Sequence, residues 1–310
     1  MSTAFIFPGQ GSQSIGMMNS LAESYPVVQE TFAEASAILG HDLWRLVTEG
    51  PAEKLNSTEY TQPAMLTAGV ATWGAWKVAG GKSPARMAGH SLGEYTALVC
   101  AGVLSFADAV SLVADRASFM QAAVAEGEGA MAAILGLDDE SVRTLCQDNA
   151  AGEVLEAVNY NAPGQVVVAG SAAAVARLAE NAKSAGARRA LILPVSVPSH
   201  CTLMKPASRQ MAERLKDVTF NPSEIPVIHN VNVQPAADEN EIRDLLARQI
   251  SEPVRWVETI NSMHNDGVAQ LIECGPGKVL CGLTKRINRD ITCIPLINNE
   301  LIEEALEAKR

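Results

Sequence analysis

Residues 85–99 read ARMAGHSLGEYTALV, a short apolar run followed by a glycine-flanked serine and a helix-forming segment. Within this stretch Gly89, Ser91 and Gly93 match the pattern G-x-S-x-G. In this pattern the serine lies on a strand-to-helix turn that is too tight for side chains at the flanking positions. The stretch therefore predicts an α/β fold with a nucleophilic Ser91 at the carboxyl end of a strand, where such folds bind ligands. The simpler alternative is a Gly-Ser turn that only begins a helix.

The rest of the chain alternates strand-like and helix-like runs, which is typical of an α/β fold with a largely parallel sheet. The other strand-like runs lie at 4–7, 227–231, 268–274 and 291–296, and we expect the strand before Ser91 at 85–89. The expected helices cover 63–78, 92–101, 105–125, 240–250, 253–265 and 279–288.

The middle of the chain has a different order. Expected strands at 131–135, 154–159, 165–169 and 188–193, with helices at 139–149 and 172–185, give the order β-α-β-β-α-β. This is the split βαβ arrangement of a ferredoxin-like unit. We therefore predict a small domain, 127–196, inserted into a large domain formed by 1–126 and 197–310.

Composition excludes several classes of protein. The chain has 310 residues, 47% of them hydrophobic, which is enough for a large core, and a net charge of -11. Non-specific nucleic-acid binders need a basic surface, so this balance argues against one. No apolar run is long enough to span a membrane, and no signal peptide is evident. The six cysteines show no metal-ligand spacing. We expect a cytoplasmic protein without a metal.

A serine nucleophile needs a base, and His200 is the best placed of the five histidines. It follows the expected strand at 188–193 and precedes a helical run at 204–215. His90 adjoins Ser91, but a neighbour on a sharp turn usually points its side chain away. No Asp or Glu is evident to orient His200, although a carbonyl group would also serve. A helix-capping or core histidine is the simpler alternative.

Arg116 lies in the apolar arc of an expected helix, between Leu112 and Met120 at 100° per residue. A guanidinium that faces an interior needs a carboxylate or phosphate partner, because leaving it unpaired is costly. The pattern leaves open whether that partner is internal or a substrate. The same helix begins with Ser105 and Asp108, which resembles a capping box.

The opening stretch TAFIFPGQGSQ, 3–13, looks like a phosphate-binding loop because Gly9 and Gly11 follow a strand-like run. A dinucleotide-binding loop needs a third glycine, G-x-G-x-x-G, and that position is Ser14. The sequence therefore disfavours a nucleotide-binding module.

Six motifs in order carry a resemblance to a known family: GQGSQ at 9–13, GHSLGEYTALV at 89–99, Arg116, NAPGQVVVAG at 161–170, VPSH at 197–200 and ECGPGKVL at 273–280. Over residues 3 to 298 the chain resembles the malonyl-CoA:acyl-carrier-protein transacylases of bacterial type II fatty acid synthesis. The resemblance implies an α/β-hydrolase-like core with a ferredoxin-like insertion. Related acyltransferases of polyketide synthesis share the pattern, and a serine esterase or thioesterase would share Ser91 and His200.

The resemblance also implies roles for individual residues. Ser91 would be acylated, with His200 as its base, and the main-chain carbonyl of Gln249 would orient His200. The backbone N–H groups of Gln10 and Leu92 would form an oxyanion hole, and Arg116 would bind the malonyl carboxylate. Two further residues, His90 and Asn161, would line or support the site.

The implied substrate is malonyl-CoA, with no other cofactor, and the implied partner is acyl carrier protein, bound by a monomeric enzyme. Because that carrier is acidic, docking needs local basic residues. Two clusters are candidates: Arg188 with Arg189, and Lys285 with Arg286.

Overall fold

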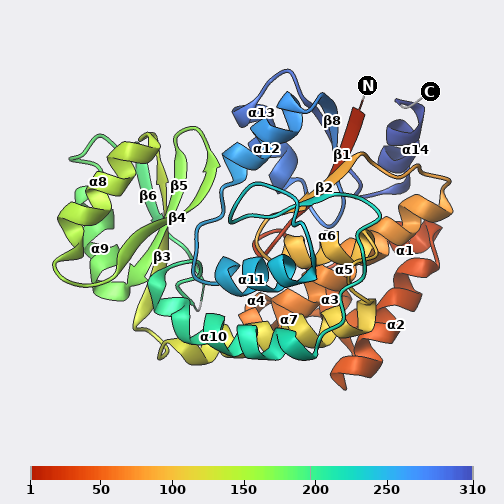
Figure 1. The fold of residues 1–310 in the computed structure, drawn as a ribbon, viewed down its shortest axis with the longest axis horizontal. Helices are drawn as coiled ribbons and strands as arrows, with labels where there is room; N and C mark the ends of the chain where they lie inside the picture. Colours follow the sequence, from red (N-terminus) through yellow and green to blue (C-terminus); the bar gives the residue numbers. More distant parts are fainter. Residues whose placement is uncertain (1, 196, 309–310) are drawn as a thin grey trace.

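The computed structural model of the chain describes residues 2–195 and 197–308. Figure 1 shows a larger α/β part and, beside it, a smaller part built on its own sheet. The fold is mixed α/β, with one parallel and one antiparallel sheet, as the element pattern predicts. The predicted domain boundary at residue 196 lies outside the described residues. Among the described helices, none is both long and apolar enough to cross a membrane.

The larger sheet has five parallel strands in the order β7-β2-β1-β8-β9. Phe7 pairs with Gly89, and Ile6 pairs with Glu273, so three strands end side by side. The loops that follow β1 and β2 therefore meet at one edge of the sheet. The bounds are β1 Ser2–Phe7, β2 Arg86–Gly89, β7 Val227–Ile228, β8 Val268–Glu273 and β9 Thr292–Pro295.

Helices cover both faces of this sheet (Figure 1). Successive side chains of a strand point to opposite faces. Accordingly, Phe5 and Phe7 pack into the core with α2, α5, α6 and α7, while Ala4 and Ile6 pack with α12 and α13. The helices of this part are α1 Asn19–Ser24, α2 Val27–Leu39, α3 Leu43–Glu49, α4 Ala52–Asn56, α5 Thr58–Val78, α6 Gly93–Cys100, α7 Phe106–Ala123, α10 Lys205–Arg214, α11 Glu239–Gln249, α12 Trp256–Asn265, α13 Val279–Ile287 and α14 Asn299–Glu307, with 3-10 turns η1 Thr202–Met204 and η2 Leu215–Asp217.

The smaller sheet is antiparallel, in the order β4-β5-β3-β6. Helices α8 and α9 pack on one of its faces. Its elements follow the predicted order: β3 Gly129–Leu135, α8 Asp139–Ala150, β4 Leu155–Ala162, β5 Gln165–Ser171, α9 Ala172–Asn181 and β6 Arg189–Ile192. A bridge between Asn159 and Val254 joins β4 to the segment that precedes α12. The smaller sheet is thereby linked to the larger part of the molecule beside the site described below.

Two expected elements have different limits in the structure. Helix α5 begins at Thr58 rather than at Pro63, which lies inside it. Both Gln62 and Pro63 are buried, so packing compensates for the hydrogen bond that proline cannot make. The strand expected at 227–231 is only Val227–Ile228. Beyond it, the side chains of His229 and Asn230 bond to residues of β2 and α6 instead of extending the ladder.

Candidate active site

Ser91 lies on the turn between β2 and α6 with φ +52°, a strained conformation for a residue other than glycine. The flanking glycines make this turn possible. A Cβ on Gly89 would lie 1.8 Å from the Gly93 carbonyl carbon, and one on Gly93 would lie 2.0 Å from the Phe7 oxygen. The Asn230 side chain accepts a 2.8 Å hydrogen bond from the Ser91 N–H. The turn therefore presents Ser91 at the carboxyl end of the sheet.

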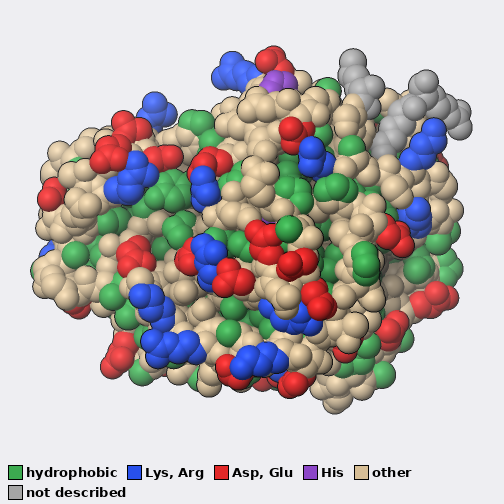
Figure 2. All heavy atoms as spheres, in the orientation of Figure 1, with side chains coloured by type: hydrophobic (Ala, Val, Ile, Leu, Met, Phe, Trp, Pro, Cys, Tyr) green, Lys and Arg blue, Asp and Glu red, His purple; other side chains and the backbone are tan. Residues whose placement is uncertain are grey.

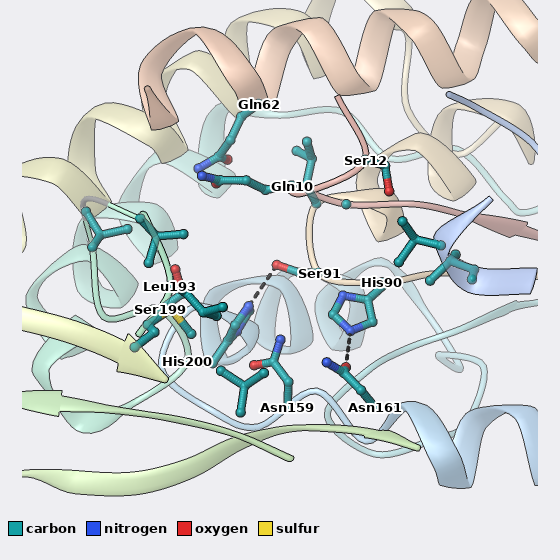
Figure 3. Close-up of a pocket in the computed structure, with 18 of the residues that line it drawn as sticks. Gln10, Ser12, Gln62, His90, Ser91, Asn159, Asn161, Leu193, Ser199 and His200 are labelled. Atoms are coloured by element: carbon teal, nitrogen blue, oxygen red, sulfur yellow. Dashed lines mark hydrogen bonds between the residues drawn. The ribbon is translucent and has the colours of Figure 1, made fainter. Parts of the chain in front are cut away.

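The structure brings His200 to Ser91: His200 Nε2 lies 2.8 Å from Ser91 Oγ (Figure 3). His200 Nδ1 lies 2.7 Å from the main-chain oxygen of Gln249. A carbonyl oxygen can only accept, so Nδ1 carries the proton and Nε2 is free to accept one from the serine. Burial, reinforced by the positive charge of Arg116, lowers the pKa of His200 to about 3. His200 is therefore neutral at pH 7.

The side chain of Arg116, in α7, also contacts the Ser91 hydroxyl. Its Nη2 donates to Ser91 Oγ at 3.3 Å and to Gln249 Oε1 at 3.1 Å. Its Nη1 donates to Gln62 Oε1 at 2.6 Å. Arg116 is only 2% exposed, and its Nε has no hydrogen-bond partner among the described residues. These hydrogen-bond partners are neutral, so no carboxylate bonds directly to the guanidinium beside the nucleophile.

Several residues of this arrangement were not predicted from the sequence, among them Gln62, Glu94 and Asn230. Gln62 holds the Arg116 guanidinium, and Glu94 is a fully buried carboxylate. Glu94 Oε1 bonds to His229 Nδ1 at 2.8 Å, and Glu94 Oε2 accepts from the Asn230 N–H and from Gln249 Nε2. Glu94 stands in the quoted motif three residues after Ser91, but its contacts are with residues more than 130 positions away. The spacing of residues in the sequence does not indicate these contacts.

His90 and Asn161 pair with each other, with His90 Nε2 2.7 Å from Asn161 Oδ1 (Figure 3). Burial lowers the pKa of His90, and its ring packs against Trp256 with centroids 5.4 Å apart. His90 therefore supports the wall of the site, and its bonded nitrogen faces away from Ser91.

Gln10 and Leu92 both line the cavity in front of Ser91. Among the described residues, neither backbone N–H donates to a protein acceptor. Leu92 immediately precedes α6, whose free N–H groups favour negative charge. Both N–H groups therefore border the cavity without a protein acceptor.

The cavity has a volume of about 190 Å³ and lies between the two sheets. One wall comes from the loops after β1 and β2, and the opposite wall from the smaller sheet, including Asn159 and Val167. Val279 and Leu283 of α13 also line it. A substrate in this cavity would contact both parts of the molecule.

One group of possible metal ligands occurs in 2–195 and 197–308: Glu273, Cys281 and Cys293. Cys281 and Cys293 form a disulfide, which the sequence did not predict. Glu273 accepts from the N–H groups of Leu280 and Cys281. All three side chains are therefore engaged. The other cysteines (Cys100, Cys146, Cys201 and Cys274) are free and buried, as expected for small hydrophobic residues.

Comparisons with known proteins agree with this architecture. The family model described as "Acyl transferase domain" matches residues 4–296. Malonyl CoA-acyl carrier protein transacylase of Escherichia coli strain K12 is 57% identical over 98% of both chains, and the protein of the same name from Bacillus subtilis is 45% identical over 98% of this chain and 96% of its own. A solved complex of a type II PKS acyl-carrier protein with its malonyl-transacylase aligns with a TM-score of 0.98 and 51% identity, over 99% of this chain and 100% of that one. The chain therefore belongs to the acyl transferase family, among the malonyl CoA-acyl carrier protein transacylases.

Proposed function

We propose that this protein transfers the malonyl group of malonyl-CoA to the phosphopantetheine thiol of acyl carrier protein through a malonyl-Ser91 intermediate. One observation carries the proposal. A Ser-His pair, Ser91 and His200, shares its cavity with Arg116, a buried cation whose hydrogen-bond partners are all neutral. The pair supplies acyl transfer, and the cation supplies a preference for an acyl group that ends in a carboxylate.

In the first half-reaction Ser91 Oγ attacks the thioester carbonyl carbon, and its proton moves to His200 Nε2. The carbonyl oxygen becomes an oxyanion that the N–H groups of Gln10 and Leu92 stabilise; one such donor contributes about 2.7–4 kcal/mol. The C–S bond then breaks, and coenzyme A leaves with the proton from His200. Ser91 now carries a malonyl ester.

In the second half-reaction the carrier thiol gives its proton to His200 and attacks the ester carbonyl. The ester C–O bond breaks, Ser91 regains the proton, and malonyl-carrier protein leaves. The Gln249 carbonyl keeps Nδ1 of His200 protonated throughout, so Nε2 accepts and returns the proton in each half. The scheme is ping-pong and uses no metal or redox cofactor.

Malonyl selectivity follows from the desolvation of Arg116. A malonyl carboxylate would replace lost hydration with charge-assisted hydrogen bonds, whereas an acetyl group would leave the buried cation without a directly bonded anion. The same argument disfavours a simple esterase, which has no need of a buried cation beside its nucleophile. A polyketide-type acyltransferase would share the chemistry and differ only in the carrier it serves.

The carrier must dock where its thiol can reach Ser91. Arg188, Arg189 and Arg286 line one surface hollow together with Gly136 and Gly164. Arg286 also bonds to Gln165, a residue of the catalytic cavity. On the face shown in Figure 2, basic and acidic side chains are interspersed, so an acidic carrier needs such a local cluster. We place carrier docking at this arginine hollow, beside Lys285.

The finer expectations about the domains, the oligomeric state and the location of the protein are part of the proposal. The β4-β5-β3-β6 order and the antiparallel pairing support a ferredoxin-like small domain at 127–196. The strained Ser91 turn supports an α/β-hydrolase-like large domain, 1–126 with 197–310. We propose a monomeric cytoplasmic enzyme that binds neither membrane nor nucleic acid.

The test is to incubate the protein with malonyl-CoA, without a thiol acceptor, and to map the acylated peptide by mass spectrometry. We expect one malonyl group on Ser91 that persists until carrier protein or another thiol is added, and none on Ser91→Ala. Labelling of a different residue would overturn the scheme. Rapid loss of the malonyl group to water would favour the esterase alternative.

A further inference from the structure

Glu94 is a buried carboxylate that the acyl-transfer scheme does not use. It is fully buried in the first turn of α6, where the helix dipole favours a negative charge. Each of its oxygens has a partner: His229 on one side, and Asn230 and Gln249 on the other. A buried charge is costly to maintain, so the interactions it makes warrant a functional explanation.

Glu94, together with the Ser91 main-chain oxygen, determines which way the Gln249 amide faces. Gln249 Nε2 lies 3.0 Å from Glu94 Oε2 and 2.9 Å from the Ser91 main-chain oxygen, and both of these atoms only accept. Gln249 Oε1 is therefore turned toward Arg116 Nη2, which only donates. The opposite amide orientation would place the NH2 group against the guanidinium and an oxygen against the carboxylate. Glu94 and the Ser91 main-chain oxygen together exclude it.

The arrangement also places the Glu94 carboxylate near the Arg116 guanidinium without occupying the N–H donors of Arg116. A direct Glu94–Arg116 ion pair would occupy the donors that a substrate carboxylate needs. The Gln249 amide instead stands between them, so the carboxylate holds Arg116 in position while Nε stays unpartnered.

We propose that Glu94 is a positioning residue that sets the preference for carboxylated acyl groups by locking the Gln249 amide, which in turn aligns Arg116 beside Ser91. This inference rests on the proposed malonyl transfer. His229 and Asn230 hold Glu94 from the far side and complete the support. Gln249 therefore acts twice: its main-chain oxygen orients His200, and its side chain orients Arg116.

The primary variant is Glu94→Gln, which keeps the shape and removes the obligate acceptor. We expect kcat/KM for malonyl-CoA to fall at least tenfold more than kcat/KM for acetyl-CoA. A purely structural role would lower both by the same factor, and an unchanged ratio in a folded variant would overturn the proposal. The matched control is Glu273→Gln, which alters another fully buried carboxylate that lies outside this network. It should leave the ratio unchanged.

A double-mutant cycle tests whether Glu94 acts through Arg116. In an Arg116→Ala background, Glu94→Gln should lower the malonyl-to-acetyl ratio no further. A further fall of the same size would show a separate route and overturn the proposal. If Glu94→Gln does not fold, Gln249→Met decides: it removes the amide, keeps the main-chain carbonyl, and should also lose the preference. Malonyl labelling of Ser91 in the parent protein tests the underlying function independently.

Discussion

Replacing Gly9 with alanine tests the proposed Gln10 oxyanion donor through the backbone that carries it. Gly9 lies in the loop after β1, and a Cβ there would stand 2.5 Å from the His90 main-chain oxygen and 3.7 Å from the Leu92 nitrogen. Ordinary contact begins near 3.4 Å, so the loop or the Ser91 turn must retreat by about 0.9 Å. Both proposed donors border this contact.

The expected loss follows from the geometry. A shift of this size moves a donor out of the narrow range in which an oxyanion hydrogen bond is strong, and losing one donor lowers kcat by about 10²–10³-fold. The steric strain itself should cost about 1–3 kcal/mol of stability. Gly9 is not among the glycines with positive φ, so the steric clash is the main perturbation that alanine introduces.

The assay is steady-state transfer from malonyl-CoA to carrier protein, with thermal unfolding measured on the same sample. Gly282→Ala is the matched control, because a Cβ at that position of α13 meets no atom within 4 Å. It should keep full activity. A folded Gly9→Ala protein with kcat within threefold of the parent would refute the assignment of the Gln10 N–H. Gly11 is a poorer probe: a Cβ there meets nothing within 4 Å, but its φ of +105° strains any replacement.

Three other perturbations have defined outcomes. Arg116→Ala should lower kcat/KM for malonyl-CoA roughly 10- to 100-fold more than for acetyl-CoA, since hydrogen bonds to a charged group are worth about 1.5–3 kcal/mol; an intact preference would make Arg116 structural. Because the pKa of His200 falls from 6.5 to about 3 on folding, the unfolded chain binds more protons between these values, and stability is lost as the pH falls through that window. Thermal unfolding should show a shallower pH dependence in His200→Gln, and identical slopes would contradict this reasoning. Ser105→Ala should cost about 0.5–2 kcal/mol in denaturant unfolding, since Ser105 Oγ accepts from the Asp108 N–H at 3.0 Å; no loss would mean that the cap is unimportant.

Local patterns predicted the parts of the fold that depend on local chemistry. The glycines around Ser91 predicted the sharp turn because the turn leaves no room for a Cβ at these positions, and this steric requirement involves only a few neighbouring residues. The order of strand-like and helix-like runs along the chain predicted both sheets. Ser105 caps the start of α7, as the sequence predicts. Helical periodicity placed Arg116 toward the interior, but it left its partner open. The structure shows neutral partners, from α5, α11 and the Ser91 turn.

The remaining parts of the site depend on contacts between distant segments. Gln62 looks like an ordinary residue before a proline, and Glu94 like the polar end of a motif. Their roles arise because α5, α6 and α11 converge at the carboxyl edge of the sheet. No spacing rule links positions 94 and 249. The sequence also showed no Asp or Glu that would orient His200. The group that orients it is the main-chain carbonyl of Gln249, which any residue type would provide, so no residue pattern could indicate it.

The C-terminal end of α11 is the element that organises the nucleophile and its base together. Ser91 and His200 both have positive φ, +52° and +67°. These conformations cost free energy, and they persist only where neighbouring contacts offset the cost. The Ile250 carbonyl accepts the His200 N–H, and the Gln249 side chain donates to the Ser91 carbonyl. One helix end therefore fixes the backbone of both strained residues and the imidazole of one of them. Because free carbonyls are available only where a helix ends, the oxygens that serve His200 come from the last helical residue and the one after it.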